Sequence, residues 1–338
     1  MTQSNLATDQ FPAIEQPRRK AEPATRQAII LINMGAATTP ESVEPFLYEL
    51  FVDPLMIQLP LGRFYQKAFA RFISRRRAPK MAPHYQEIGG SPLLPQTEDQ
   101  ARALQKLVDV PVKIAMRYSE PRAKGVMEEL AAEGVKEVLA LPLYPQFSRT
   151  TTETSFVELD ELAARLGMRV KYVGRYAGDE RYVNALKAKW DETIGDRLAG
   201  KENVAVLMTA HGIPVIYAKK GDPYLDEVRC TANKLKAKLP PELPVSLAFQ
   251  SRLGPVEWAR PYLDEEAERL GAAGVKTLVM FPITFVSEHL ETNYELDIEV
   301  ADMAKAAGVE EVIRIPTVRD HPIFIDMLAD LATKALAS

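Results

Sequence analysis

Two segments of this chain follow one pattern: AAEGVKEVLALPLYP at residues 131–145 and GAAGVKTLVMFPITF at residues 271–285. Each passes from the end of a helical pattern through a glycine into an apolar run that closes on proline. The two segments start 140 residues apart and align without a gap. Glycine after a helix is common before any strand, so a chance likeness is the alternative. We favour a duplication within the chain.

Eight short apolar runs, including these two, alternate with longer helical patterns. The runs have no polar face, which is typical of parallel strands covered by helices on both sides. Their order repeats as four strands and then four. The sequence therefore predicts an α/β fold of two similar Rossmann-like domains that face a central cleft. The runs begin at residues 28, 112, 135, 170, 204, 244, 275 and 311.

The chain is expected to divide into four segments. Residues 1–26 are polar, contain three prolines and have no apolar signal core, so they are predicted to form a mobile extension. Residues 27–176 and 177–319 are the two predicted domains. Residues 320–338 are expected to form a C-terminal helix that packs back on the first domain.

Composition excludes several classes of protein. A formal net charge of −4 argues against a nucleic-acid partner, which selects a basic surface. Cys230 is the single cysteine, so neither an internal disulfide nor a thiolate-held zinc or iron–sulfur site can form. No apolar run reaches the length of about 18 residues that crosses a bilayer. We therefore expect a cytoplasmic protein.

Ligands of such folds bind beyond the carboxyl ends of the parallel strands. The first strand of each half ends alike, in ILINMG and LMTAHG, so Met34 and His211 should take equivalent positions. With Arg117 and Glu291, they are expected to line the cleft. No strand is followed by GxGxxG or GxxxxGK[ST], which argues against a nucleotide cofactor.

The segment FVSEHLETNYELD, residues 285–297, ends an apolar run in negative charge. If a helix begins here, four glutamates share one of its faces because their spacings are three and four. Like charges so placed repel, and a bound cation would stabilise them. A solvated helix face is the alternative, but the position after a strand favours a functional role. The four are Glu288, Glu291, Glu295 and Glu299.

His211 is one of four histidines and stands in TAHGIP at the end of a predicted strand. Gly212 and Pro214 give the chain a rigid exit that would hold the imidazole in the cleft. A neutral imidazole can bind a divalent metal or accept a proton near pH 7, whereas a structural histidine would do neither. Neither HExxH nor GxSxG occurs, which argues against zinc hydrolysis and a serine nucleophile.

A basic cluster, RFISRRRAPK at residues 71–80, overlaps an apolar segment at residues 52–73. The cluster fits a solvated face, a phospholipid contact or a carboxylate site. The apolar segment fits either a core helix or an exposed lip at a membrane surface or a ligand mouth. Together these patterns suit a large flat ligand with acidic edges and a metal at its centre.

The motifs resemble those of the ferrochelatases, which insert Fe²⁺ into a porphyrin to make haem. The resemblance runs in order from about residue 28 to residue 318 and implies the chelatase fold. It rests on LINMG, RRAPKMAPHYQEIGGSPL, MRYSEP, LPLYPQFSRTTT, TAHGIP, GDPY, QSRLGPVEWARP and ITFVSEHLETNYELD. This chain has two glycines where the family usually has IGGGSP.

The resemblance implies roles for individual residues. His211 and Glu291 match the catalytic pair that takes up the two pyrrole protons, and whether His211 acts first as ligand or as base stays open. The metal is expected at His211, Glu291, His289 and Glu295. Porphyrin-binding positions are matched by Met34, Arg77, Lys80, Tyr85, Arg117, Trp258 and Phe285.

The resemblance also implies the substrates, which are Fe²⁺ and protoporphyrin IX. Met34 favours this porphyrin, since relatives that use coproporphyrin III tend to have tyrosine in the neighbouring position. A coproporphyrin ferrochelatase and a non-catalytic haem or porphyrin-binding protein are the alternatives. Arg149 stands near the position of a cluster-binding cysteine in some relatives, so no iron–sulfur cluster is expected. Peripheral membrane contact and a monomer or homodimer are also expected.

Overall fold

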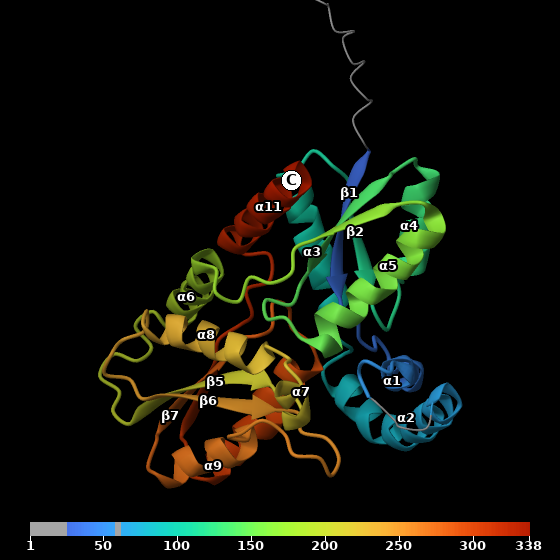
Figure 1. Ribbon diagram of the computed structural model, residues 1–338. Coiled ribbons are helices and arrows are strands. Elements are labelled where there is room, and N and C mark those ends of the chain that lie inside the picture. Colours follow the sequence, from blue (N-terminus) through green and yellow to red (C-terminus); the bar gives the residue numbers. More distant parts are fainter. Residues whose placement is uncertain (1–25, 58–61) are drawn as a thin grey trace, which may run out of the picture.

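Two parallel sheets organise the computed structural model, which describes residues 26–57 and 62–338 (Figure 1). The strand order is β2-β1-β3-β4 in one sheet and β6-β5-β7-β8 in the other. All eight predicted strands are present, and the α/β fold of two Rossmann-like halves is confirmed. The strands are β1 Gln27–Asn33, β2 Val112–Met116, β3 Glu137–Pro142, β4 Arg169–Tyr172, β5 Val204–His211, β6 Val245–Gln250, β7 Thr277–Pro282 and β8 Glu311–Arg314. The predicted N-terminal extension lies outside the described residues, except for Arg26.

Strand pairing repeats between the two sheets. The central strand β1 begins to pair with β3 at Gln27, and β5 begins to pair with β7 at Val204, which is 177 residues later. Met34 and His211 are separated by the same 177 residues, so they hold equivalent positions at the ends of the central strands. The equivalence predicted from ILINMG and LMTAHG is therefore present in the fold.

Helices cover both faces of each sheet. In equivalent places, α4 buries Met127 and Leu130 against the first sheet, and α9 buries Ala267 and Leu270 against the second. The helices are α1 Val43–Val52, α2 Gly62–Glu87, α3 Leu93–Gln105, α4 Ala123–Ala132, α5 Thr154–Leu166, α6 Glu180–Ile194, α7 Val215–Lys219, α8 Tyr224–Lys236, α9 Leu263–Ala272, α10 Ala301–Ala306 and α11 Pro322–Ala337. Shorter elements are the 3₁₀ turn η1 Pro40–Ser42 and the π-helices η2 Arg149–Glu153 and η3 Glu291–Val300.

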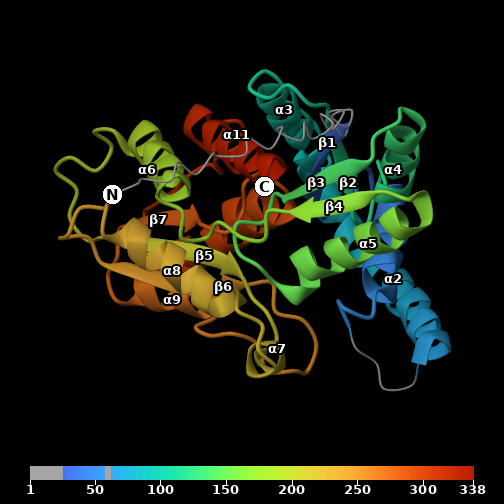
Figure 2. The same cartoon turned by 45° about the horizontal axis from the view of Figure 1, so that its top comes forward.

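The helix that follows the last strand of each sheet packs on the other sheet (Figure 2). The helix α6 follows β4, the last strand of the first sheet, and places Trp190 on Phe281 of β7, with ring centroids 6.2 Å apart. From the second half, α11 contacts α3, β3 and β4. Lys171 of β4 donates to the Leu336 carbonyl at 3.0 Å. One hydrophobic core therefore continues from sheet to sheet, and the boundaries at residues 176 and 319 stay predictions.

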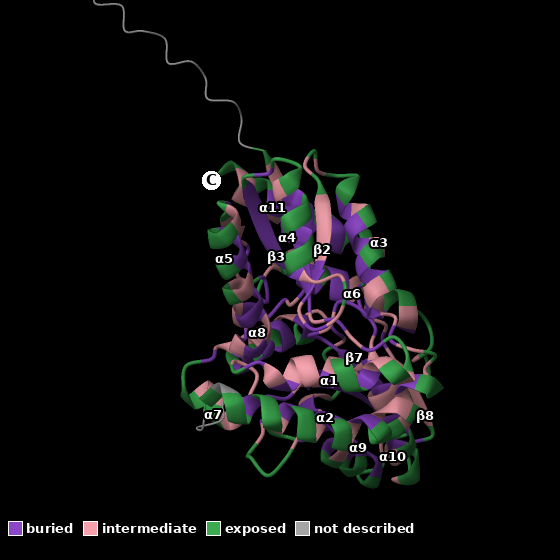
Figure 3. Ribbon diagram, turned by 90° about the vertical axis from the view of Figure 1, so that its right-hand side faces the viewer, coloured by how far each residue is buried: buried purple, intermediate pink, exposed green. Residues whose placement is uncertain are grey.

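An insertion between β1 and α3 supplies α1 and α2, which pack on each other. The helix α2 carries both buried and exposed residues (Figure 3). On its outer face, Phe64 and Phe72 are 80% and 65% exposed. Of the apolar segment at residues 52–73, residues 58–61 lie outside the described residues, and the part in α2 combines a buried face with an exposed lip that carries Phe64 and Phe72. Gly89 and Gly90 then end α2 with φ of 72° and 90°. A Cβ on Gly90 would lie 2.3 Å from the Thr38 carbonyl oxygen, so this position requires glycine.

Candidate active site

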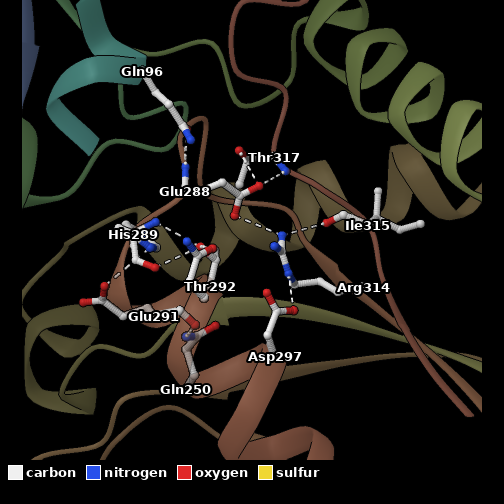
Figure 4. Close-up of polar contacts among 11 residues, drawn as sticks. Gln96, Gln250, Glu288, His289, Glu291, Thr292, Asp297, Arg314, Ile315 and Thr317 are labelled. Atoms are coloured by element: carbon white, nitrogen blue, oxygen red, sulfur yellow. Dashed lines mark hydrogen bonds and ion pairs between the residues drawn. The ribbon is translucent and has the colours of Figure 1, made fainter. Parts of the chain in front are cut away.

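The segment after β7 forms a π-helix rather than a regular α-helix. Glu288 precedes the π-helix, which runs from Glu291 to Val300, so it does not share a helix face with Glu291 and Glu295. Glu288 turns toward Arg314, while Glu291 lies beside His289 (Figure 4). Glu295 accepts a hydrogen bond from Gln250 of β6. Glu288 is therefore not part of the carboxylate stripe predicted from the sequence.

His211 ends β5, and its surroundings select one form of its ring. Nδ1 lies 2.6 Å from the Gly212 carbonyl oxygen, so Nδ1 carries the proton and Nε2 keeps the lone pair of the neutral ring. Trp258 lies beside it, with ring centroids 6.4 Å apart. A Cβ on Gly212 would lie 3.0 Å from the Gln250 carbonyl oxygen and 3.3 Å from the indole. Glycine at this position thus permits the close approach of Trp258.

His289 is 13% exposed and lies at the start of the π-helix. Its Nδ1 is 3.4 Å from Glu291 Oε2, and neither ring nitrogen has a well-aligned hydrogen-bond partner in the described chain. Burial lowers the pKa of His289, and the positive charge that His211 can carry adds to this, while Glu291 opposes it. Phe285 contacts the ring edge-on at 4.2 Å between centroids. The lowered pKa favours the neutral form of His289, whose imidazole has a lone pair.

Glu295 is the most firmly held carboxylate of the site. Its Oε1 accepts from the Ser251 backbone N–H at 2.9 Å, and its Oε2 accepts from Ser251 Oγ at 2.6 Å and Gln250 Nε2 at 3.0 Å. Burial and the charge of Glu291 raise the pKa of Glu295, whereas these hydrogen bonds lower it. Glu295 is thus a fixed carboxylate with an enhanced affinity for a proton.

The lip also contributes to this site. Burial raises the pKa of Tyr85 well above its usual value, and the charge of Glu291 adds to the effect, which places the phenol near that carboxylate. His84 stacks on Tyr294 of the π-helix, with centroids 3.9 Å apart. Burial lowers the pKa of Arg77, whose Nε has no hydrogen-bond partner among the described residues. Lys80 is exposed on α2.

Met34 and Arg117 lie in the first half. The Met34 carbonyl accepts from the Tyr118 backbone N–H at 2.9 Å. Arg117 binds Asp53 Oδ2 at 2.7 Å and Glu158 Oε2 at 3.2 Å, which ties the end of α1 to α5. The guanidinium of Arg117, which the family resemblance matched to a porphyrin-binding position, is thus already paired with two carboxylates. Its role toward a ligand stays a prediction.

The structure thus brings one group of predicted residues together. Charge interactions and ring contacts link His211, Trp258, Phe285, His289, Glu291, Glu295 and Tyr85. Among residues 26–57 and 62–338, no three His, Cys, Asp or Glu side chains are arranged to hold a metal ion. A separate cavity of about 310 Å³, lined by Arg175, Glu227 and Cys230 among others, contains none of the predicted site residues.

The family model for ferrochelatase matches residues 26–336. This chain belongs to the ferrochelatase family. The ferrochelatase of Aquifex aeolicus is 40% identical to it over 312 residues, which cover 90% of this chain and 98% of that protein. The ferrochelatase of Geotalea uraniireducens is 39% identical over 318 residues, which cover 93% and 99% of the two chains.

Solved chelatase structures share the fold. SirB from Bacillus subtilis with Fe³⁺ has a TM-score of 0.57 and 16% identity, and the match covers 93% of this chain and 96% of that one. At this identity the likeness concerns the fold alone.

The ferrochelatase motifs pointed to most of the clustered residues but not to their supports. Ser251 and Gln250 lie in QSRLGP and hold Glu295, and Arg314 binds Glu288. The position of QSRLGP at the end of a strand was a signal for Ser251. No pattern in the sequence distinguishes Arg314 from the other arginines.

Proposed function

We propose that this protein inserts Fe²⁺ into protoporphyrin IX to give protohaem, the last step of haem biosynthesis. The observation that carries the proposal is that bases from two different elements influence each other electrostatically, since the charge of His211 acts on His289 and Glu295. His211 comes from the end of β5, and the His289–Glu291 pair comes from the start of η3. Family membership supports the reaction, and the choice of porphyrin and the place in the pathway are our inference.

The proposed reaction needs two proton acceptors. Metal insertion breaks two pyrrole N–H bonds, and each electron pair stays on its nitrogen and binds Fe²⁺, whose charge does not change. The two protons leave the ring. Nε2 of His211 can accept one, and the Glu291 carboxylate beside His289 can accept the other. Glu295, held by Ser251 and Gln250, then lies next in line to take a proton or to bind the incoming cation.

The rim suits an amphipathic porphyrin. Trp258 and Phe285 offer aromatic surface next to His211 and His289. Arg77 and Lys80 of the lip are the proposed partners of the propionates. Met34 and the apolar lip favour protoporphyrin IX over coproporphyrin III, which has four carboxylates. A non-catalytic porphyrin-binding protein would use the same surface without turnover.

We further propose that the lip rests on an anionic membrane surface of the cytoplasm. Phe64 and Phe72 are exposed on α2, with Arg71 and Arg75 on the same outer face. In the described part of the chain, no helix is both long and apolar enough to cross a membrane. Binding to vesicles that contain an anionic lipid should fall when both phenylalanines are changed to serine.

The test is anaerobic Fe²⁺ insertion into protoporphyrin IX and, in parallel, coproporphyrin III, followed by absorbance over many equivalents. Faster turnover with protoporphyrin supports the proposal, and preference for coproporphyrin overturns the choice of porphyrin. A stoichiometric spectral shift without turnover would identify a binding protein. His211→Ala should abolish turnover. The control is His321→Ala, which changes the histidine that caps α11 and should retain turnover. Equal activities would remove His211 from the mechanism.

A further inference from the structure

The turn that carries His289 is anchored from the first half of the molecule. Gln100 Nε2 of α3 donates to the Val286 carbonyl oxygen at 3.0 Å. Gln96 Oε1 of the same helix accepts from the Glu288 backbone N–H at 2.7 Å (Figure 4). Both glutamine side chains are buried. The backbone just before His289 is therefore fixed by hydrogen bonds from the other sheet's helix.

The Glu288 side chain is anchored from the second half. Its Oε1 accepts from the Thr317 backbone N–H at 2.8 Å and from Thr317 Oγ1 at 3.1 Å. Its Oε2 accepts from Arg314 Nη1 at 2.9 Å. The pKa of Glu288 is lowered, since Arg314 and Thr317 outweigh the effect of burial. Glu288 is thus an ionised carboxylate that is saturated with donors and turned away from the proposed site.

Arg314 joins this turn to the π-helix. While Nη1 binds Glu288, Nε donates to Asp297 Oδ1 at 2.5 Å, so one guanidinium holds residues on either side of Glu291. Its side chain is 15% exposed, and that of Glu288 is 9% exposed. The pKa of Arg314 is raised by these two carboxylates even though burial opposes it. A solvated surface pair would be neither so buried nor bound at two points.

A lysine in place of Arg314 could not reproduce these contacts. The ammonium group is a single point of charge, whereas the planar guanidinium presents separate N–H groups to two carboxylates. Lysine would keep the charge balance near Glu288 and lose one of the two links. Methionine would lose both links and leave two unpaired carboxylates.

We propose that Arg314 is a positioning residue for metal insertion. By binding Glu288 and Asp297 together, it fixes the turn of His289 against the π-helix that carries Glu291, and Gln96 fixes the same turn from the first half. The inference rests on the proposed function and deepens it, because it assigns the alignment of His289 with Glu291 to residues that touch neither substrate.

The experiment compares Arg314→Met, Arg314→Lys and Gln96→Met with the unchanged protein. Arg181→Met is the matched control, since Arg181 also binds two carboxylates, Asp179 at 2.6 Å and Asp330 at 2.5 Å, but on α6. For each protein we would measure kcat, the KM for Fe²⁺, the Kd for protoporphyrin by fluorescence quenching, and the Kd for Co²⁺ by calorimetry. Thermal unfolding reports stability.

We expect Arg314→Met to lower kcat at least tenfold and to weaken Co²⁺ binding at least fivefold, with the porphyrin Kd changed less than twofold. Arg314→Lys should lie between, and Gln96→Met should lose threefold or more in kcat. Arg181→Met should keep kcat within twofold, whatever its loss of stability. The Gln96 variant creates no unpaired charge, so it keeps the test open if Arg314→Met does not fold.

Two results would overturn the positioning role. One is a kcat within twofold of the unchanged protein in Arg314→Met or Gln96→Met. The other is a Kd for porphyrin that rises by the same factor as kcat falls. Failure of the proposed function looks different, because then the unchanged protein would not turn over either porphyrin. In that case only the Kd for Co²⁺ tests the positioning role of Arg314. Equal Kd values for Co²⁺ in Arg314→Met and Arg181→Met would refute it.

Discussion

Ser251 offers a way to separate the chemistry of Glu295 from the stability of the fold. Its Oγ donates to Glu295 Oε2 at 2.6 Å, and its backbone has a φ of 64°, in the left-handed region that favours glycine. Ser251→Ala removes the hydroxyl and keeps the backbone strain. Ser251→Gly removes the same hydroxyl and relieves the strain, which is worth about 1 kcal/mol.

Both variants should change the pH dependence of metal insertion equally. A hydrogen bond to a charged group contributes about 1.5 kcal/mol, and about 1.4 kcal/mol corresponds to one pH unit. The bond from Ser251 lowers the pKa of Glu295, so its loss raises that pKa and protonates the carboxylate at higher pH. The acid limb of the rate profile should therefore move up by about one pH unit in each variant.

The assay is initial-rate insertion from pH 5.5 to 9, paired with urea unfolding at pH 7. Ser251→Gly should be more stable than Ser251→Ala by about 1 kcal/mol, with matching rate profiles. Rate profiles that differ between the variants, or an acid limb that does not move in either, would refute the role given to the Ser251 hydroxyl. Gln250 and the Ser251 N–H still hold Glu295 in both variants, so its position should be retained.

Three further outcomes follow from described contacts. Arg117→Met should lower the free energy of unfolding in urea by about 3–5 kcal/mol, because Asp53 and Glu158 lose a buried partner, and a loss below about 1 kcal/mol would contradict the ion pair. Glu288→Gln should make the protein lose less stability on acidification. The pKa of Glu288 is lower in the folded protein than in the unfolded chain, where it is near 4.5, so the ionised carboxylate stabilises the fold above that pH. This stabilisation is lost as the pH falls through the folded pKa. Urea unfolding from pH 7 to 3 checks this, and parallel curves would count against it. Gly90→Ala should be more destabilising than Gly89→Ala, since both have positive φ but only the Gly90 Cβ meets the Thr38 carbonyl within 4 Å; equal unfolding midpoints would refute the clash.

The strands and their repeated order were predictable because buried parallel strands appear in sequence as continuous apolar runs, and the repeat at residues 131 and 271 marked equivalent places. The equivalence of Met34 and His211 followed from the same pattern. The π-helix was not predictable, since spacings of three and four suggest an α-helix, and Glu288 was misplaced because the helix begins only after it. The ion pair of Arg117 with Asp53 was not predictable either, because Asp53 lies 64 residues away in the chain. Sequence motifs show which side chains are present, whereas contacts between residues distant in the chain determine which side chains are left to bind a ligand.

The exchange of α6 and α11 between the halves gives this chain the architecture of a swapped dimer joined end to end. The helix that follows each sheet packs on the other one: Trp190 of α6 contacts Phe281 of β7, and α11 contacts α3 beside the first sheet. A single half expressed alone would expose the apolar surface that the borrowed helix covers, and it could regain that cover by pairing with a second copy. The two central strands end at equivalent positions, which Met34 and His211 occupy, so the two sheets differ in chemistry where their folds correspond.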